Sequence, residues 1–210
     1  MIHEILPVGP LQCNCSIFGD EASREALVVD PGDDLEEIQG ILDRHSLRLA
    51  AIVVTHAHID HIGGAGRLHR LSGAPVYMNE QDLPLAGRLD MQAAWLGVAT
   101  PEAAAVDVPV KDGYQIRLAG HSFQVLDTPG HTPGSISLVL AAENKVLAGD
   151  TLFRDSIGRT DLPGGDGRLL LKSIREKLLP LDDNLIVVPG HGELTTIGRE
   201  REFNWFLRGL

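Results

Sequence analysis

The sequence predicts an α/β protein made of two sheets with helices on their outer faces. Short apolar runs of strand type alternate with helical runs along all 210 residues. The two halves of the chain are broadly alike, because each holds several strands followed by a helix. Two sheets with helices outside suit this order of elements. The length and the absence of a repeat or a low-complexity linker predict one domain over residues 1–210.

Strands are expected where short apolar runs end in turn residues such as proline and glycine. A strand near the N-terminus is expected to hold Cys13 and Cys15. The run "LAAIVV" is continuously apolar, which indicates a strand covered on both faces. The expected strands cover residues 25–30, 49–54, 75–78, 115–118, 122–127, 135–140, 145–149 and 185–190.

Helices are expected where apolar residues recur every three or four positions. Asp33 or Asp34 is expected to cap the first helix. Its buried stripe consists of Leu35, Ile38, Ile41 and Leu42. Further helices are expected over 63–71, 167–179 and 197–207, with a broken helix inside 80–105. Met91 and Trp95 are expected to pack in the interior rather than to cap a pocket. The buried stripe of the last helix is expected to be Ile197, Phe203 and Phe206 or Leu207.

Composition and charge exclude several classes of protein. A formal net charge of -11 argues against a nucleic-acid partner and against binding to anionic membranes. The opening "MIHEILPVGP" has neither a basic nor a long apolar region, so no signal peptide is expected. No segment approaches the roughly 18 apolar residues of a membrane span. Cys13 and Cys15 are too close in sequence to bridge without strain. Two reduced thiols in a cytoplasmic protein are therefore expected.

The stretch "THAHIDH" places three histidines and an aspartate directly after an apolar strand. Imidazole nitrogen and carboxylate oxygen are ligands of zinc and similar metals. Side chains two apart in an extended segment point the same way, so His56 and His58 can reach one metal. Asp60 and His61 follow as the chain turns into a helix, and they can reach a second metal. The neighbouring Thr55 is expected only to satisfy backbone groups with its hydroxyl.

Three later residues complete this set, and each stands in a loop or at a strand end. His131 lies in the Pro/Gly-rich "DTPGHTPGS", Asp150 ends "VLAGD", and His191 ends "VVPGH". The ligand count predicts that His131 joins the first metal and His191 the second, with Asp150 bridging the two ions. Open positions on two metals suit a shared hydroxide. The remaining histidines are expected to be surface or hydrogen-bonded residues: His3, His45, His69 and His121.

These motifs resemble the metallo-β-lactamase fold superfamily, and more narrowly its glyoxalase II-like (hydroxyacylglutathione hydrolase-like) branch. "THAHIDH" matches the signature His-x-His-x-Asp-His, and His131, Asp150 and His191 match the later ligands in order. The "SIGRTDLPGGD" loop is also typical of that branch. The resemblance implies an αββα sandwich. About 19 residues follow His191, so the glutathione-binding helical domain of glyoxalase II is expected to be missing, as in short bacterial forms.

The resemblance implies a metal-dependent hydrolase of a thioester such as an S-(2-hydroxyacyl)glutathione. A metal-bridging hydroxide would attack the carbonyl carbon, and Asp60 would ligate one metal and orient that hydroxide. Zinc is the expected metal, with iron or manganese as alternatives. The predicted partner is the small-molecule thioester alone, with no nucleic acid, no membrane and no oligomeric state specified. Arg159 can clamp a substrate carboxylate or can simply pair with Asp161.

Other functions stay open at this point. Persulfide dioxygenases share the fold and the "GRTD" loop, and they use one iron held by counterparts of His56 or His58, His131 and Asp150. A lactonase of the same fold is also chemically reasonable. A secreted β-lactamase is disfavoured by the missing signal peptide and by Asp150, where one lactamase group carries a cysteine ligand. The acidic charge disfavours a nuclease. Seven intact ligands disfavour a purely structural metal site, which would be closed.

Overall fold

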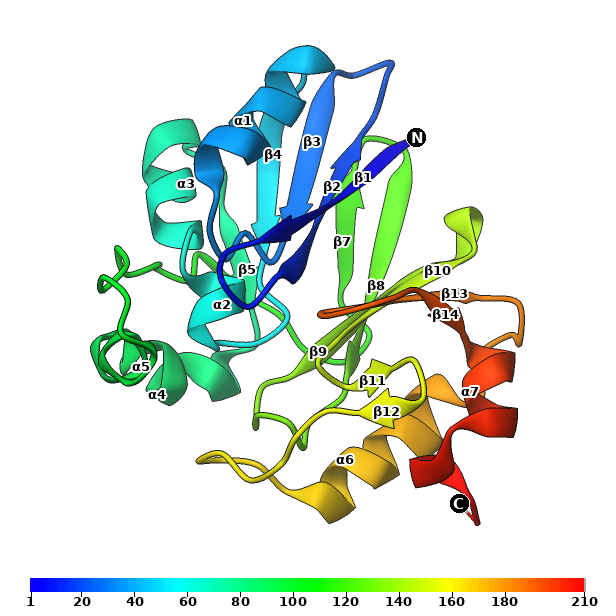
Figure 1. The fold of residues 1–210 in the computed structure, drawn as a ribbon. Coiled ribbons are helices and arrows are strands. Elements are labelled where there is room, and N and C mark those ends of the chain that lie inside the picture. The colour runs from blue at the N-terminus through cyan, green and yellow to red at the C-terminus, as the bar shows by residue number, and fades with distance from the viewer. Residues whose placement is uncertain (210) are drawn as a thin grey trace. The chain divides into compact units, whose positions relative to one another are not determined.

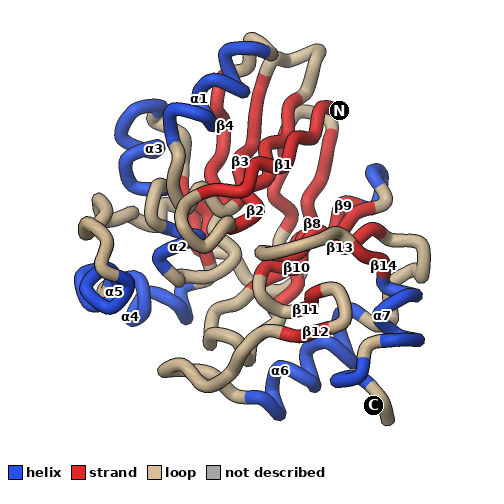
Figure 2. Tube along the Cα trace, viewed as in Figure 1, coloured by secondary structure: helices blue, strands red, loops and turns tan. Residues whose placement is uncertain are grey.

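The computed structural model describes residues 1–209 of the chain. They form two compact units (Figure 1). The first unit comprises Met1–Val110 and Arg117–Gly120, and the second comprises Lys111–Ile116 and the chain from His121 onward. Each unit holds one mixed sheet and its own helices (Figure 2). The predicted class, α/β with two mixed sheets flanked by helices, is confirmed.

The sheet of the first unit has the strand order β1-β2-β3-β4-β5-β6. Pairing is antiparallel from β1 to β3 and parallel from β3 to β6. The strand β4 carries consecutive buried residues, as its apolar continuity predicted. The bounds are β1 (Ile2–Val8), β2 (Cys13–Gly19), β3 (Glu25–Val29), β4 (Arg48–Val53), β5 (Val76–Met78) and β6 (Val108–Pro109).

Helices α1 and α3 pack on this sheet (Figure 1), and α1 does so through the apolar stripe that the sequence predicted. Leu35, Ile38, Ile41 and Leu42 of α1 and Leu68 of α3 join strand residues in one core. The expected broken helix over 80–105 is present as a 3₁₀ turn and two short helices. The bounds are α1 (Leu35–Arg44), α2 (Ile59–Ile62), α3 (Ala65–Ser72), the 3₁₀ turn Glu80–Asp82, α4 (Leu83–Ala86) and α5 (Leu89–Leu96).

One expectation for the first unit is confirmed in position only, and another is wrong. Asp34 occupies the N-cap position of α1, but its side chain accepts a hydrogen bond from the backbone N–H of Gly9 instead of capping the helix. Met91 and Trp95 do not pack in the interior, since they are 63% and 73% exposed. They lie on the outer side of α5, whose buried residues are Leu89 and Ala93.

The sheet of the second unit has the strand order β14-β13-β10-β9-β8-β7. The β10–β13 pair is parallel, whereas β13–β14, β9–β10 and β8–β9 are antiparallel. A separate ribbon joins β11 to β12. The bounds are β7 (Gln115–Leu118), β8 (His121–Asp127), β9 (Ile136–Leu140), β10 (Lys145–Gly149), β11 (Leu152–Phe153), β12 (Ser156–Ile157), β13 (Ile186–Pro189) and β14 (Thr195–Thr196).

The helices of the second unit pack on this sheet through Leu170, Ile174, Leu178, Ile197 and Leu207 (Figure 1). They are α6 (Gly167–Ser173), which continues as a π-helical segment (Ile174–Leu178), and α7 (Ile197–Phe203), which is followed by a 3₁₀ turn (Trp205–Leu207). Another 3₁₀ turn (Ala141–Glu143) joins β9 to β10. Within residues 1–209, no helix has the length and apolar character needed to cross a membrane.

The predicted stripe of the last helix is only partly correct. Ile197 and Leu207 are buried, but Phe203 and Phe206 are 56% and 50% exposed. Helix α7 ends at Phe203, and Asn204 caps a new 3₁₀ turn through its side chain. The break shifts the phase of the helix, so the spacing used to choose the stripe does not continue past residue 203.

Candidate metal centre

His56 and His58 lie in an extended segment between β4 and α2, as the motif predicted. The Nε2 of His56 is 3.1 Å from the Nδ1 of His58. Two ligands that each lie about 2.1 Å from a tetrahedral ion are roughly 3.4 Å apart. The two histidines therefore present nitrogens at a spacing that suits one metal.

Asp60 and His61 lie on the short helix α2, and their side chains also approach each other. The Nε2 of His61 is 3.6 Å from the Oδ2 of Asp60. His61 is fully buried, and its Nδ1 donates a hydrogen bond of 2.9 Å to Asp30. This bond keeps the proton on Nδ1 and leaves the Nε2 lone pair directed toward Asp60. A buried carboxylate behind a histidine is the usual way to fix the tautomer of a metal ligand.

Asp30 also receives two hydrogen bonds from Thr55. The Thr55 backbone N–H donates to Oδ1, and its hydroxyl donates to Oδ2, each at 2.7 Å. The same hydroxyl lies 3.2 Å from Nδ1 of His56, from which it can accept. The expectation that Thr55 satisfies backbone groups is therefore wrong: its hydroxyl joins a carboxylate to a histidine. Sequence reasoning missed Asp30, although it ends an apolar strand as Asp150 does.

The backbone of the motif is held by side chains from the segment 80–96. Asp82 accepts from the N–H of Ala57 at 2.9 Å, and Gln92 accepts from the N–H of Ile59 at 2.9 Å. Gln92 also donates to the carbonyl of Ala57 at 3.2 Å. These bonds fix the extended conformation that places His56 and His58 on one side.

The two cysteines are free thiols in β2, and both are buried. The Sγ of Cys13 lies 3.5 Å from Nδ1 of His61. Burial raises the pKa of the Cys13 thiol to about 11 and raises that of Cys15 well above its usual value. The two cysteines are not bridged, as their spacing predicted, and Cys13 is part of the packing behind His61.

Gly32 allows the loop after β3 to touch α2. A Cβ at Gly32 would lie 1.6 Å from the carbonyl oxygen of Asp60, so this contact needs glycine. We expect Gly32→Ala to lower the free energy of unfolding by about 2–3 kcal/mol, because the backbone on either side must move. Gly40→Ala is the matched control: nothing lies within 4 Å of a Cβ there. In helix α1 that change should raise stability by about 0.5–1 kcal/mol. Urea unfolding of both variants checks the pair, and equal effects would contradict the interpretation.

The second unit brings His131, Asp150 and His191 together. The Oδ2 of Asp150 is 3.5 Å from Nε2 of His131 and 3.8 Å from Nε2 of His191. All three follow or terminate strands, namely β8, β10 and β13. His131 is 2% exposed, and its Nδ1 donates a 2.8 Å hydrogen bond to the carbonyl of Arg159. Its proton is thus held on Nδ1, which leaves the Nε2 lone pair facing Asp150.

Arg159 contributes its backbone to this arrangement and its side chain to an ion pair. The guanidinium makes two hydrogen bonds of 2.8 Å to Asp161. The hydrogen bonds from Arg159 lower the pKa of Asp161 to about 2. Both side chains are exposed. Of the two roles expected for Arg159, the structure shows the ion pair with Asp161. Arg159 could bind a substrate carboxylate only if that carboxylate replaced Asp161.

The chemistry of the donors fits divalent metals in both units. Each unit presents imidazole nitrogens beside a carboxylate oxygen, which is the ligand set of zinc, iron and manganese sites. The hydrogen bonds to Nδ1 of His61 and His131 leave the opposite nitrogen as the ligand atom. The assignment of the seven residues to two particular ions stays a prediction.

The other histidines have structural partners. His3 stacks on Phe18 and bonds Ser16, His45 pairs with Glu4, and His69 bonds the carbonyl of Ala74. The expectation that they are surface or hydrogen-bonded residues is confirmed for these three.

The fold and the donor set together fit a metal-binding protein of the metallo-β-lactamase type. The chain belongs to the metallo-β-lactamase superfamily, whose family model matches residues 8–191. The family predicted from "THAHIDH" and the later ligands is thus confirmed.

Particular members of this family are similar over nearly the whole chain. The hydroxyacylglutathione hydrolase GloC of Haemophilus influenzae is 39% identical, and the match covers 97% of each chain. The crystal structure of BLEG-1 B3 metallo-beta-lactamase has a TM-score of 0.92 at 38% identity, covering 99% of this chain and all of that one. The structure of TTHA1623 in a di-iron-bound form has a TM-score of 0.88 at 39% identity, covering 97% of this chain and all of that one.

Proposed function

We propose that the protein is a metal-dependent hydrolase of a thioester such as an S-(2-hydroxyacyl)glutathione. The similarity to GloC over 97% of both chains carries the proposal. The donor set supports it, because each unit supplies histidine nitrogens beside a carboxylate. The ligands proposed are the seven predicted from the sequence: His56, His58, Asp60, His61, His131, Asp150 and His191.

Two divalent ions held by these residues would supply a water of near-neutral pKa and a Lewis acid for the carbonyl. The chain's own groups orient the reactants. The Asp60 carboxylate accepts a hydrogen bond from the attacking water and so directs its lone pair at the carbonyl carbon. Asp30 keeps the His61 proton on Nδ1, on the side away from Asp60. A thiolate leaving group needs no general acid, because a thiol has a pKa near 8.5.

Cleavage of a β-lactam is the second candidate. The similarity to BLEG-1, whose name describes a B3 metallo-β-lactamase, favours it. A β-lactam is also an acyl compound, so the same donors would serve. The two candidates differ in the leaving group, since an amide nitrogen needs a proton to leave whereas a thiolate does not.

Metal content and turnover measured on one preparation test the function. We expect about two metal ions per chain in protein purified without chelator, together with hydrolysis of S-lactoylglutathione. Removal of the ions by dialysis against a chelator should abolish turnover, and added zinc, iron or manganese should restore it. A β-lactam and glutathione persulfide, with an oxygen electrode for the latter, serve as comparison substrates. One iron per chain with oxygen uptake and no thioester turnover would overturn the proposal.

A further inference from the structure

A cavity of about 430 Å³ lies in the first unit and has Asp60 in its wall. It is formed by the turn after β1, the first residues of α1 and the loop before them, helices α2 and α3, and the segment 96–102, which starts at the last residue of α5. We call it the Asp60 cavity. Its volume is in the range of small-molecule pockets. A proposed metal ligand in the wall places such a molecule beside the reacting atoms.

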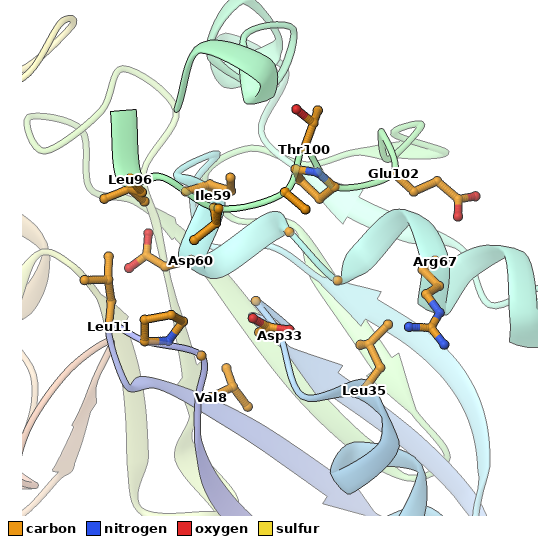
Figure 3. A pocket seen from close by; sticks show the side chains of 18 of the residues that line it. Val8, Leu11, Asp33, Leu35, Ile59, Asp60, Arg67, Leu96, Thr100 and Glu102 are labelled. Carbon is orange, nitrogen blue, oxygen red and sulfur yellow. The ribbon is translucent and has the colours of Figure 1, made fainter. Parts of the chain in front are cut away.

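The wall of the cavity near Asp60 is apolar. Figure 3 shows Leu11 and Leu96 on either side of the Asp60 carboxylate. Leu11, Leu96 and Val98 line the cavity and are nevertheless 47%, 44% and 40% exposed. Apolar side chains left in water around a hollow are characteristic of a surface that a ligand covers. The part of the substrate that lies between Leu11 and Leu96 should therefore be hydrocarbon.

The charged groups of the cavity are mostly acidic. Arg67 lies at the end away from Asp60 (Figure 3), and its Nη2 pairs with Glu36 at 2.9 Å. Asp33 and Glu102 also line the cavity, and Glu102 pairs with the neighbouring Arg70 at 2.9 Å. Both guanidinium groups near the cavity are therefore already paired with carboxylates. Glutathione carries two carboxylates, and a site for it needs unpaired cations or N–H donors. Apart from the ions proposed at Asp60, which would hold the reacting carbonyl, the Asp60 cavity does not offer such cations. It therefore does not suit the glutathione arm of a thioester.

We propose that the Asp60 cavity binds the acyl arm of the substrate and that this arm is an uncharged aliphatic chain longer than two carbons. The inference rests on the proposed thioester hydrolysis. The carbonyl carbon would lie near Asp60, and the chain would run between Leu11 and Leu96 toward Val98. The thiol arm would then lie outside this cavity.

Thioesters of N-acetylcysteamine test the acyl arm, because this thiol is small and uncharged. We expect kcat/KM to rise roughly 15-fold from the acetyl to the hexanoyl thioester, since each of the four added methylenes, when partly buried, adds about twofold. The succinyl thioester, which ends in a carboxylate, should be turned over at least about tenfold more slowly than the hexanoyl thioester. Equal kcat/KM values for all three, with thioesters hydrolysed, would overturn the inference and leave the proposed function standing.

Two variants, one in the cavity and one outside it, test whether the preference for a longer acyl chain arises in the Asp60 cavity. Leu11→Ser removes an apolar side chain from the cavity, and Leu71→Ser removes one of similar exposure (61%) on α3, outside the cavity. Leu11→Ser should reduce the hexanoyl-to-acetyl preference at least about threefold, and Leu71→Ser should leave it unchanged. Equal changes in both variants would contradict the assignment of the chain to this cavity.

Binding of hexanamide and acetamide to the zinc-loaded protein tests whether the cavity binds an acyl chain, independently of whether the protein hydrolyses thioesters. Hexanamide should produce saturable amide shifts in nuclear magnetic resonance spectra at residues 8–11 and 96–102, and acetamide should not. Saturable shifts support the cavity assignment even if no thioester is hydrolysed, in which case only the proposed function fails. Absence of hexanamide shifts would overturn the cavity assignment whatever the activity.

Discussion

Asp150→Asn should lower kcat/KM for thioester hydrolysis by about 10³-fold or more and should reduce the metal content of the protein. The Oδ2 of Asp150 lies within 4 Å of the Nε2 atoms of both His131 and His191. Loss of its negative charge removes the group that balances a bound cation between them. The asparagine side chain can also turn its NH₂ group toward the cation, and that group carries partial positive charge and repels it.

Asp182→Asn is the control for this change. Asp182 is exposed, and its Oδ1 accepts hydrogen bonds from Asn184, which an asparagine oxygen can also accept. Activity and metal content should both match the unaltered protein. Elemental analysis and steady-state kinetics on the two variants decide the question. If Asp150→Asn kept its metal and retained kcat/KM within about threefold, Asp150 would not be a ligand.

Asp30→Ala should lower the free energy of unfolding by about 3–5 kcal/mol. The carboxylate is 3% exposed and accepts hydrogen bonds from the Thr55 backbone, the Thr55 hydroxyl and His61 Nδ1. Alanine would leave these three buried donors without their acceptor and would open a small void. Urea unfolding of metal-free protein measures this effect apart from any contribution of bound ions.

Asp90→Ala, an exposed change on α5, is the comparison and should alter stability by no more than about 0.5 kcal/mol. The isosteric Asp30→Asn separates packing from the orientation of His61. It keeps the volume and one acceptor but can present N–H to His61. We expect it to weaken metal binding by about 10–100-fold with a smaller loss of stability than alanine causes. Unchanged metal affinity in Asp30→Asn would show that Asp30 does not orient His61.

Much of the fold could be predicted because hydrophobic period and turn chemistry are local. The strands at 25–29, 136–140 and 145–149 and the stripe of α1 follow directly from such patterns. The last helix was harder, because Asn204 ends one helical turn and caps the next. A period counted through that break assigns Phe206 to the interior, although its side chain is exposed. Phe203 precedes the break, but six residues separate it from Ile197, so it does not share the face of α7 that buries Ile197 and Glu200.

The candidate ligands could be identified because they cluster in one motif and recur at strand ends. The residues that position these ligands could not be identified from the sequence, because they are distant in sequence from the residues that they contact. Asp82 and Gln92 bond the backbone of Ala57 and Ile59 across 25 and 33 residues, and no local pattern reports such a contact. Asp30 did carry a signal, since it ends an apolar strand before Pro31 and Gly32. That position resembles the one that identified Asp150.

The position of the Asp60 cavity in the fold has a consequence for how substrate preference can change. Leu11 and Val98 lie in a turn and in a loop, Leu96 is the last residue of α5, and none of the three is a proposed ligand. Mutation there can change what the cavity accepts while the core and the histidines stay as they are. Proteins of similar ancestry can therefore acquire different substrates through a few surface substitutions. GloC and BLEG-1, which are 39% and 38% identical to this chain, carry names for two different activities.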